Sequence, residues 1–192
     1  MPNWCNNKLT IIGDKNELKQ VQALLFKEDE SFSFECAVPP PSNLFKENIN
    51  SEKREELNKL GIPNWYDWNN SNWGTKWDAC NVYHMEITDT QIEVFFDTAW
   101  SPPEQWFCSL CDKIESKDVH IEMLYEELGM EFAGAYVSER GWREISHYEG
   151  EIQQVDYSGN IVNYDRKMGR YRDLKGRFVS DDEVTSEANY GY

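Results

Sequence analysis

The chain has 192 residues, 40% of them hydrophobic and 14% aromatic, which is enough apolar material for one domain and excludes a disordered acidic chain. Its formal net charge of −16 should repel duplex DNA and anionic membranes unless charge is segregated along the chain. No stretch approaches the roughly 18 apolar residues that span a bilayer, and the first residues do not resemble a signal peptide. The five cysteines are an odd number at irregular spacing, which indicates reduced thiols. These features predict a cytoplasmic protein without a membrane partner.

The start of the chain reads as a strand followed by a helix. Residues 9–12 form a short, mostly apolar run, which predicts a buried strand. Asp14, with Glu17 three residues later, resembles a capping box and predicts a helix to about residue 27. The apolar face of that helix would hold Leu18, Val21 and Leu25.

A second strand and a long insertion are predicted next. In residues 31–38 every second position is apolar, which is typical of a strand with one buried face. The segment 42–78 is then too long for a turn, and Ser51 is the expected N-cap of a short helix that stops at Gly61. Four of the eight tryptophans fall near the end of this insertion, at Trp65, Trp68, Trp73 and Trp77.

The elements after the insertion complete a sheet. Residues 80–87 and 91–98 read as a hairpin, and Ser101 is the expected cap of a helix that begins at Pro102. Alternating apolar positions predict another strand near residues 119–125, and one more is expected at residues 132–137.

This order of elements predicts an α+β fold. Strand, helix, strand, insertion, two strands, helix and strand favour an antiparallel-rich sheet with two helices on one face. We expect a domain over residues 1–137, with the insertion at 42–78, and a C-terminal extension over residues 138–192. The extension would contain a hairpin, a basic stretch and an acidic, poorly ordered tail.

Charge is segregated in the extension. One acid stands among six basic residues, so this stretch carries 6 − 1 = +5 and the rest of the chain −16 − 5 = −21. The simplest interpretation is that the acids form a solvated surface with which the basic stretch pairs. The basic residues are Arg166, Lys167, Arg170, Arg172, Lys175 and Arg177.

Three motifs together resemble the YubB-type family of phage and plasmid proteins. They are residues 1–6 (MPNWCN), 72–78 (NWGTKWD) and 98–103 (TAWSPP). The resemblance implies a ferredoxin-like α+β fold without an iron–sulfur cluster, and an origin in mobile genetic elements, which places the protein in the cytoplasm of a host cell. It contributes no catalytic residues. The basic stretch matches nothing in the family pattern.

Residue types that commonly carry chemistry form no familiar pattern. Cys108 and Cys111 have CxxC spacing, but both lie in the predicted helix after Ser101 and lack a second ligand pair, which favours core packing. The three histidines, at 84, 120 and 147, show no metal-binding spacing. Motifs of serine hydrolases, P-loop NTPases and dinucleotide-binding proteins are missing. We therefore expect no metal and no cofactor, and a non-enzymatic role is favoured while an enzyme stays open.

The tryptophan-rich segment has two interpretations. In one, its indoles cap an end of the sheet and the asparagines satisfy turns. In the other, the rings form an aromatic surface that stacks on a base or contacts a protein, while Lys76 and nearby amides hold a phosphate. The candidate ligand-binding residues are Trp65, Trp68, Trp73, Thr75, Lys76, Trp77 and Trp100.

Three functional hypotheses follow. The first is a binding module of a mobile element that counters a host defence by binding a host protein or by sequestering a nucleotide-like ligand. The second is an acidic mimic of nucleic acid that blocks a DNA-binding protein, based on the charge of −21 outside the basic stretch. The third is an enzyme on a ferredoxin-like scaffold, which the fold alone neither supports nor excludes. Direct binding of duplex DNA by the basic stretch ranks below all three.

Overall fold

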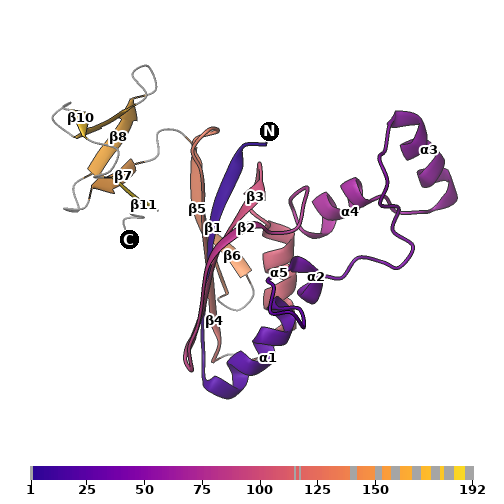
Figure 1. Ribbon diagram of the computed structural model, residues 1–192, viewed down its shortest axis with the longest axis horizontal. Coiled ribbons are helices and arrows are strands. Elements are labelled where there is room, and N and C mark those ends of the chain that lie inside the picture. Colours follow the sequence, from indigo (N-terminus) through magenta and orange to yellow (C-terminus); the bar gives the residue numbers. More distant parts are fainter. Residues whose placement is uncertain are drawn as a thin grey trace.

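The computed structural model describes residues 2–114, 116 and 118–138, together with the backbone of six further strands between residues 142 and 188 (Figure 1). Within these residues, every helix is too short or too polar to cross a membrane. In chain order the elements are β1 (Trp4–Ile12), α1 (Lys15–Leu25), α2 (Phe34–Ala37), α3 (Ser51–Leu60), α4 (Trp65–Asn72), β2 (Cys80–Ile87), β3 (Gln91–Ala99), α5 (Glu104–Lys113), β4 (His120–Glu127), β5 (Phe132–Ser138), β6 (Trp142–Glu149), β7 (Gln153–Asp156), β8 (Ile161–Asp165), β9 (Arg170–Asp173), β10 (Phe178–Val179) and β11 (Val184–Ala188).

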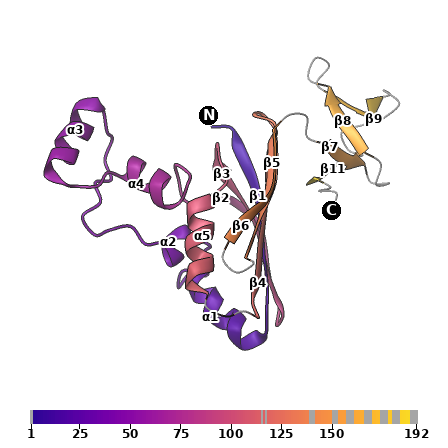
Figure 2. The ribbon, with the colours of Figure 1, turned by 180° about the vertical axis from the view of Figure 1, so that it is seen from behind.

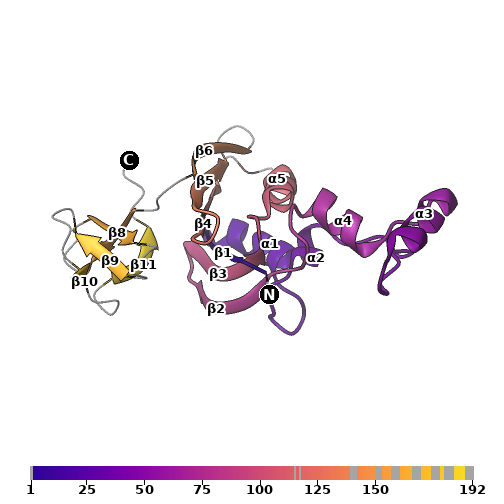
Figure 3. The same ribbon diagram turned by 90° about the horizontal axis from the view of Figure 1, so that it is seen from above.

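The main sheet has six antiparallel strands in the order β2-β3-β1-β4-β5-β6. Strand β1 is central, so Leu9 lies between Val94 of β3 and Met123 of β4. Helices α1 and α5 cover one face of this sheet (Figure 3). The strands β4-β1-β3-β2 and these two helices have the ferredoxin-like arrangement. The predicted α+β class is thereby confirmed, and β5 and β6 extend the sheet beyond β4.

The core lies between the sheet and the helices. Side chains alternate along a strand, so every second residue of β1 and β3 is buried against α1 and α5. The predicted apolar face of α1 is confirmed, because Leu18, Val21 and Leu25 are its buried residues. The largest fully buried side chains include Trp106 and Phe107 of α5, Phe96 of β3 and Tyr125 of β4.

The predicted strand at residues 31–38 is wrong. Phe32 forms only an isolated bridge with Phe26, and α2 follows directly after it. Alternation gave a false signal because the apolar side chains are buried by a helical turn, not by strand pairing. The turn is held by Asp78, whose carboxylate accepts hydrogen bonds from the Ser33 hydroxyl at 2.6 Å and from the Phe34 amide at 2.7 Å. A partner so distant in sequence cannot be read from the local pattern.

The ends of α1 and α3 follow the predicted chemistry with one shift. The Asp14 side chain accepts from the amides of Asn16 and Glu17, which confirms the start of α1. In α3 the cap is Asn50, not Ser51, and Ser51 is the first helical residue. Asparagine and serine both cap helices well, and the one that comes first in the chain, Asn50, is the cap. The helix ends as predicted at Gly61, where φ is 66°.

The insertion contains a second helix that the sequence did not indicate. Helix α4 begins after Asn64, whose side chain accepts from the Asp67 amide, and it carries Trp65 and Trp68. Figure 1 shows α4 next to α5, with α3 further out from the sheet. The helix was missed because its tryptophans and asparagines have weak helix propensity and an apolar period that follows no single face.

Strands β7 to β11 form a second sheet in the order β10-β9-β8-β7-β11 (Figure 2). The predicted C-terminal hairpin is confirmed by the antiparallel pairing of β7 with β8. The tail was predicted to be poorly ordered, yet β11 lies in it and pairs with β7. The domain boundary after residue 137 stays a prediction.

Candidate functional site

The tryptophan-rich segment begins with a buried anchor at Trp73. This indole is buried beside the ring of Phe34, with centroids 5.9 Å apart, and its Nε1 donates to the Val38 carbonyl at 3.0 Å. Trp68 packs edge-on against Trp73 at 5.3 Å. Trp73 therefore holds α4 against the core, as the core-cap interpretation requires.

Gly74 brings the segment close to the start of α5. Its φ is +82°, and a Cβ at this position would lie 2.1 Å from Oε1 of Gln105 and 3.0 Å from the backbone nitrogen of Glu104. Ser101 was predicted to cap α5, but its hydroxyl donates to the Gly74 carbonyl at 2.8 Å. Helix α5 begins at Glu104 without a side-chain cap. The expected cap residue is thus used to bind the tryptophan-rich segment.

Thr75 joins the segment to the end of β3. Its side chain is fully buried, and its hydroxyl donates to the Ala99 carbonyl at 3.1 Å. The next carbonyl along the segment, that of Lys76, accepts from the Asn69 side chain at 2.8 Å. The Thr75 side chain and the backbone that follows it are therefore fixed by partners on β3 and α4.

Four aromatic rings surround the ammonium group of Lys76, and we call these five residues the Lys76 cluster. The distances from Nζ to the ring centroids are 4.7 Å for Trp77, 5.1 Å for Trp100, and 5.9 Å for both Trp65 and Tyr66. Each distance is within the range of a cation–π interaction. In the part of the chain that the structure describes, Lys76 forms no ion pair with a carboxylate.

The cluster is partly open to solvent. Trp100 is 40% exposed and Tyr66 is 38% exposed. The Trp77 ring lies between those of Trp100 and Trp4, at centroid distances of 5.8 Å and 6.2 Å. The aromatic rings thus continue from α4 across the segment to the beginning of β1.

Trp100 has a strained backbone. Its φ is 66°, a region that bulky residues rarely adopt. Two bonds hold it there: its amide donates to the Asn3 carbonyl at 3.0 Å, and the neighbouring Thr98 hydroxyl donates to the Ser101 carbonyl at 2.7 Å. The indole therefore projects from a turn that a glycine would adopt at lower cost.

The predicted ligand-binding residues fall into two groups. Trp65, Lys76, Trp77 and Trp100 come together in the cluster, while Thr75 and the edge-on pair of Trp68 and Trp73 support it from the inside. Sequence reasoning missed Tyr66 and Trp4. Trp4 was recoverable in principle, because β1 pairs with β3 in a register that places it opposite Ala99, beside Trp100.

The basic stretch lies mostly outside the described residues. Only the backbone of Arg170 and Arg172 is described, as part of β9. The other four basic residues, Arg166, Lys167, Lys175 and Arg177, fall outside the described residues.

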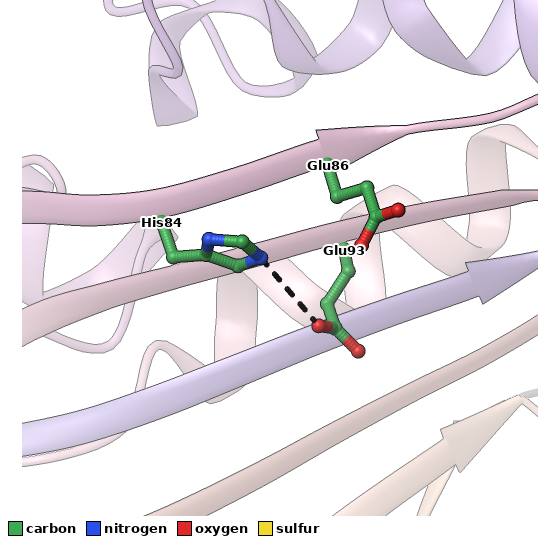
Figure 4. Close-up of side chains that lie close together, drawn as sticks. All are labelled: His84, Glu86 and Glu93. Carbon is green, nitrogen blue, oxygen red and sulfur yellow. Dashed lines mark ion pairs between the residues drawn. The ribbon is translucent and has the colours of Figure 1, made fainter.

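A second group of polar side chains lies on the hairpin of β2 and β3. His84, Glu86 and Glu93 each offer a ligand atom, and these atoms lie within 4.8 Å of one another (Figure 4). The sequence held a signal for this group, because His84 and Glu86 are two positions apart in a predicted strand and Glu93 lies in its predicted partner.

One acid of the sheet has a strongly shifted pKa. Glu126 of β4 is 8% exposed, and its Oε2 finds no hydrogen-bond partner among the residues that the structure describes. Burial raises the pKa of this carboxyl to about 7. Hollows of about 380 and 250 Å³ open at residues 45–53 and between α1 and α5, and neither is lined by Glu126. We therefore interpret Glu126 as a determinant of stability.

The CxxC cysteines lie on α5 as predicted. Desolvation is the main cause that raises the pKa of Cys108 and of Cys111 to about 12. Cys111 packs against the core. Both thiols are thus protonated near neutral pH and unsuited to act as nucleophiles.

Comparison with known proteins bears on the fold. Residues 72–165 match the family model of the ferredoxin-like domain in Api92-like protein. No curated protein matches the chain. A crystal structure of the protein api92 from Yersinia pseudotuberculosis is similar at 11% sequence identity and a TM-score of 0.45, over 78% of this chain and 98% of that one. The family match begins inside the tryptophan-rich segment and ends with β8, and it agrees with the ferredoxin-like order of strands.

Proposed function

We propose that this protein is a binding module and that the Lys76 cluster is its recognition surface. The observation that carries the proposal is Trp100, an exposed indole on a backbone with φ of 66°. Such strain costs about 1–3 kcal/mol and persists only where the surrounding structure enforces it. A glycine would fit the turn without strain. We therefore infer that the tryptophan stands there for its indole side chain and not for the turn.

The composition of the cluster favours a protein partner. Tryptophan and tyrosine dominate the binding energy of many interfaces, because they supply large and rigid contact areas. Trp100 and Tyr66 offer such exposed area next to Lys76. The supporting residues beneath them are buried and hydrogen-bonded, so little conformational freedom would be lost on binding.

The resemblance to YubB-type proteins gives the proposal its biological setting. A protein of a mobile genetic element acts in the cytoplasm of its host. In this proposal the partner is a host protein, and binding it counters a host defence.

Capture from host lysate with matched variants tests this proposal. Trp100→Gly removes the exposed indole and relieves the backbone, whereas Tyr83→Ala removes a 58% exposed aromatic side chain from β2. We expect wild type and Tyr83→Ala to capture the same host protein. Trp100→Gly should capture at least about tenfold less of it. An identical set of captured proteins for all three would overturn the proposal.

A nucleotide-like ligand is the second candidate, and Lys76 is the observation that favours it. An ammonium group without a carboxylate partner among the described residues can bind a phosphate while an indole stacks on the base. Thermal unfolding with nucleoside triphosphates tests this candidate. A rise in Tm for wild type that Lys76→Gln abolishes would support it, and unchanged Tm values across the panel would refute it.

A further inference from the structure

Three side chains that bind metals in other proteins converge on the hairpin of β2 and β3. Glu86 and Glu93 are directly opposite each other in the register of the two strands. His84 lies two residues before Glu86, so it projects from the same face of the sheet. The ligand atoms of all three lie within 4.8 Å of one another, and Figure 4 shows the side chains turned toward one another.

We propose that His84, Glu86 and Glu93 form a binding site for a divalent metal ion, with Zn²⁺ as the preferred ion. One imidazole and two carboxylates are a donor set that suits Zn²⁺. Three protein ligands leave a fourth position for water or for a group on another molecule. A zinc ion binds its ligands at about 2.0–2.2 Å, so the three ligand atoms must approach one another slightly. Their side chains lie on the exposed face of the hairpin.

Neighbouring groups orient Glu93 for this role. Its Oε2 forms an ion pair with Lys8 Nζ at 3.2 Å and accepts a hydrogen bond from the Gln91 side-chain amide at 3.4 Å. Its Oε1 faces the imidazole, 3.9 Å from Nε2 of His84. One oxygen is thus held by the sheet while the other is directed at the proposed ion. Such outer partners commonly orient metal-binding carboxylates.

The imidazole is also held in place. The His84 ring packs edge-on against Phe95, with centroids 5.4 Å apart, so it faces Glu93 from a fixed direction.

Repulsion between the carboxylates of Glu86 and Glu93 favours binding of a cation between them. Like charges that lie directly opposite in an antiparallel pair destabilise a sheet. Lys8 offsets part of this cost at Glu93, and its ion pair has side chains 32% and 16% exposed. A divalent cation between the two carboxylates would remove the remaining repulsion.

Zinc titration of the whole chain tests the site. The protein is stripped with chelator, kept reduced, and titrated with ZnCl₂ by calorimetry. We expect wild type to bind one Zn²⁺, and we expect His84→Ala and Glu86→Gln each to weaken binding at least about tenfold. His120→Ala, on an exposed position of β4, is the matched histidine control and should bind as wild type does.

Two further readouts keep the result interpretable. Glu86→Gln removes a like-charge contact, so it should fold without metal and lose only the rise in Tm that Zn²⁺ gives to wild type. A variant with Cys36 and Cys80 changed to serine should keep the zinc affinity, because the proposed ligands are not thiolates. The proposal is overturned if His84→Ala binds within about twofold of wild type or if the serine variant abolishes binding.

Discussion

The ammonium of Lys76 lies 5.1 Å from the ring centroid of Trp100, although the two residues belong to segments on either side of the β2–β3 hairpin. The adjacent bond from Thr75 to the Ala99 carbonyl keeps those segments together. The exposed part of the cluster is therefore positioned by buried, hydrogen-bonded neighbours. This relationship makes the contribution of the support and that of the surface separable by mutation.

Gly74→Ala should destabilise the fold strongly. The added Cβ would meet Gln105 and the backbone of Glu104, and φ at this position is +82°. We expect the free energy of unfolding to fall by about 2 kcal/mol or more, measured by urea denaturation. Gly61→Ala is the matched control, because its φ is +66° but a Cβ would have no atom within 4 Å. This variant should lose only about 1 kcal/mol, and equal losses would contradict a special role for the contact with α5.

Trp100→Gly should leave stability nearly unchanged, whereas Trp100→Ala should lower it. Glycine relieves the strain at φ of 66° but gives up the contacts of the indole with Trp77 and Lys76, and these effects offset each other. Alanine gives up the contacts and keeps the strain. We expect the two variants to differ by about 1 kcal/mol in thermal or chemical unfolding. If Trp100→Ala proves as stable as Trp100→Gly, the backbone at this position is not strained.

Glu126→Gln should stabilise the protein only at high pH. Burial raises the pKa of Glu126 to about 7 in the folded state, from an ordinary value of 4.5. The folded protein therefore binds the proton more tightly, and this stabilisation is complete below pH 4.5 and is lost as the pH rises through about 7. Glutamine stays neutral, so at pH 8 the variant should exceed wild type by up to about 3 kcal/mol and match it near pH 4.

Urea denaturation at several pH values measures this difference. Exposed Glu55 of α3 provides the control, since Glu55→Gln should give a nearly constant difference from wild type. A constant difference for Glu126→Gln as well would show that its carboxyl titrates normally.

Cys108 and Cys111 should react slowly with iodoacetamide. Because burial raises the pKa of both thiols to about 12, little thiolate forms at pH 8. We expect labelling in the native protein to be at least about 100-fold slower than in protein unfolded with guanidinium, as followed by peptide mass spectrometry. Rapid native labelling of either residue would contradict the packing role and would revive a redox interpretation of the CxxC spacing.

Local chemistry explains which elements could be predicted. The start of α1 depends on Asp14 and the amides next to it, and the β2–β3 hairpin depends on alternating residues around a short turn. The wrong strand at residues 31–38 and the unforeseen α4 have the opposite cause. Asp78 holds α2 from far along the chain, and Trp73 fixes the end of α4 by burial beside Phe34.

The same distinction applies to the candidate sites. Composition and hydrophobic period are local properties, so they were enough to predict the α+β fold and the concentration of aromatic and polar residues near Lys76. The burial of Thr75 beside an exposed Trp100, and the position of Glu93 opposite Glu86, became known from the folded structure alone. Those outcomes depend on strand register and on contacts between distant segments, whose free energies no single stretch of sequence contains.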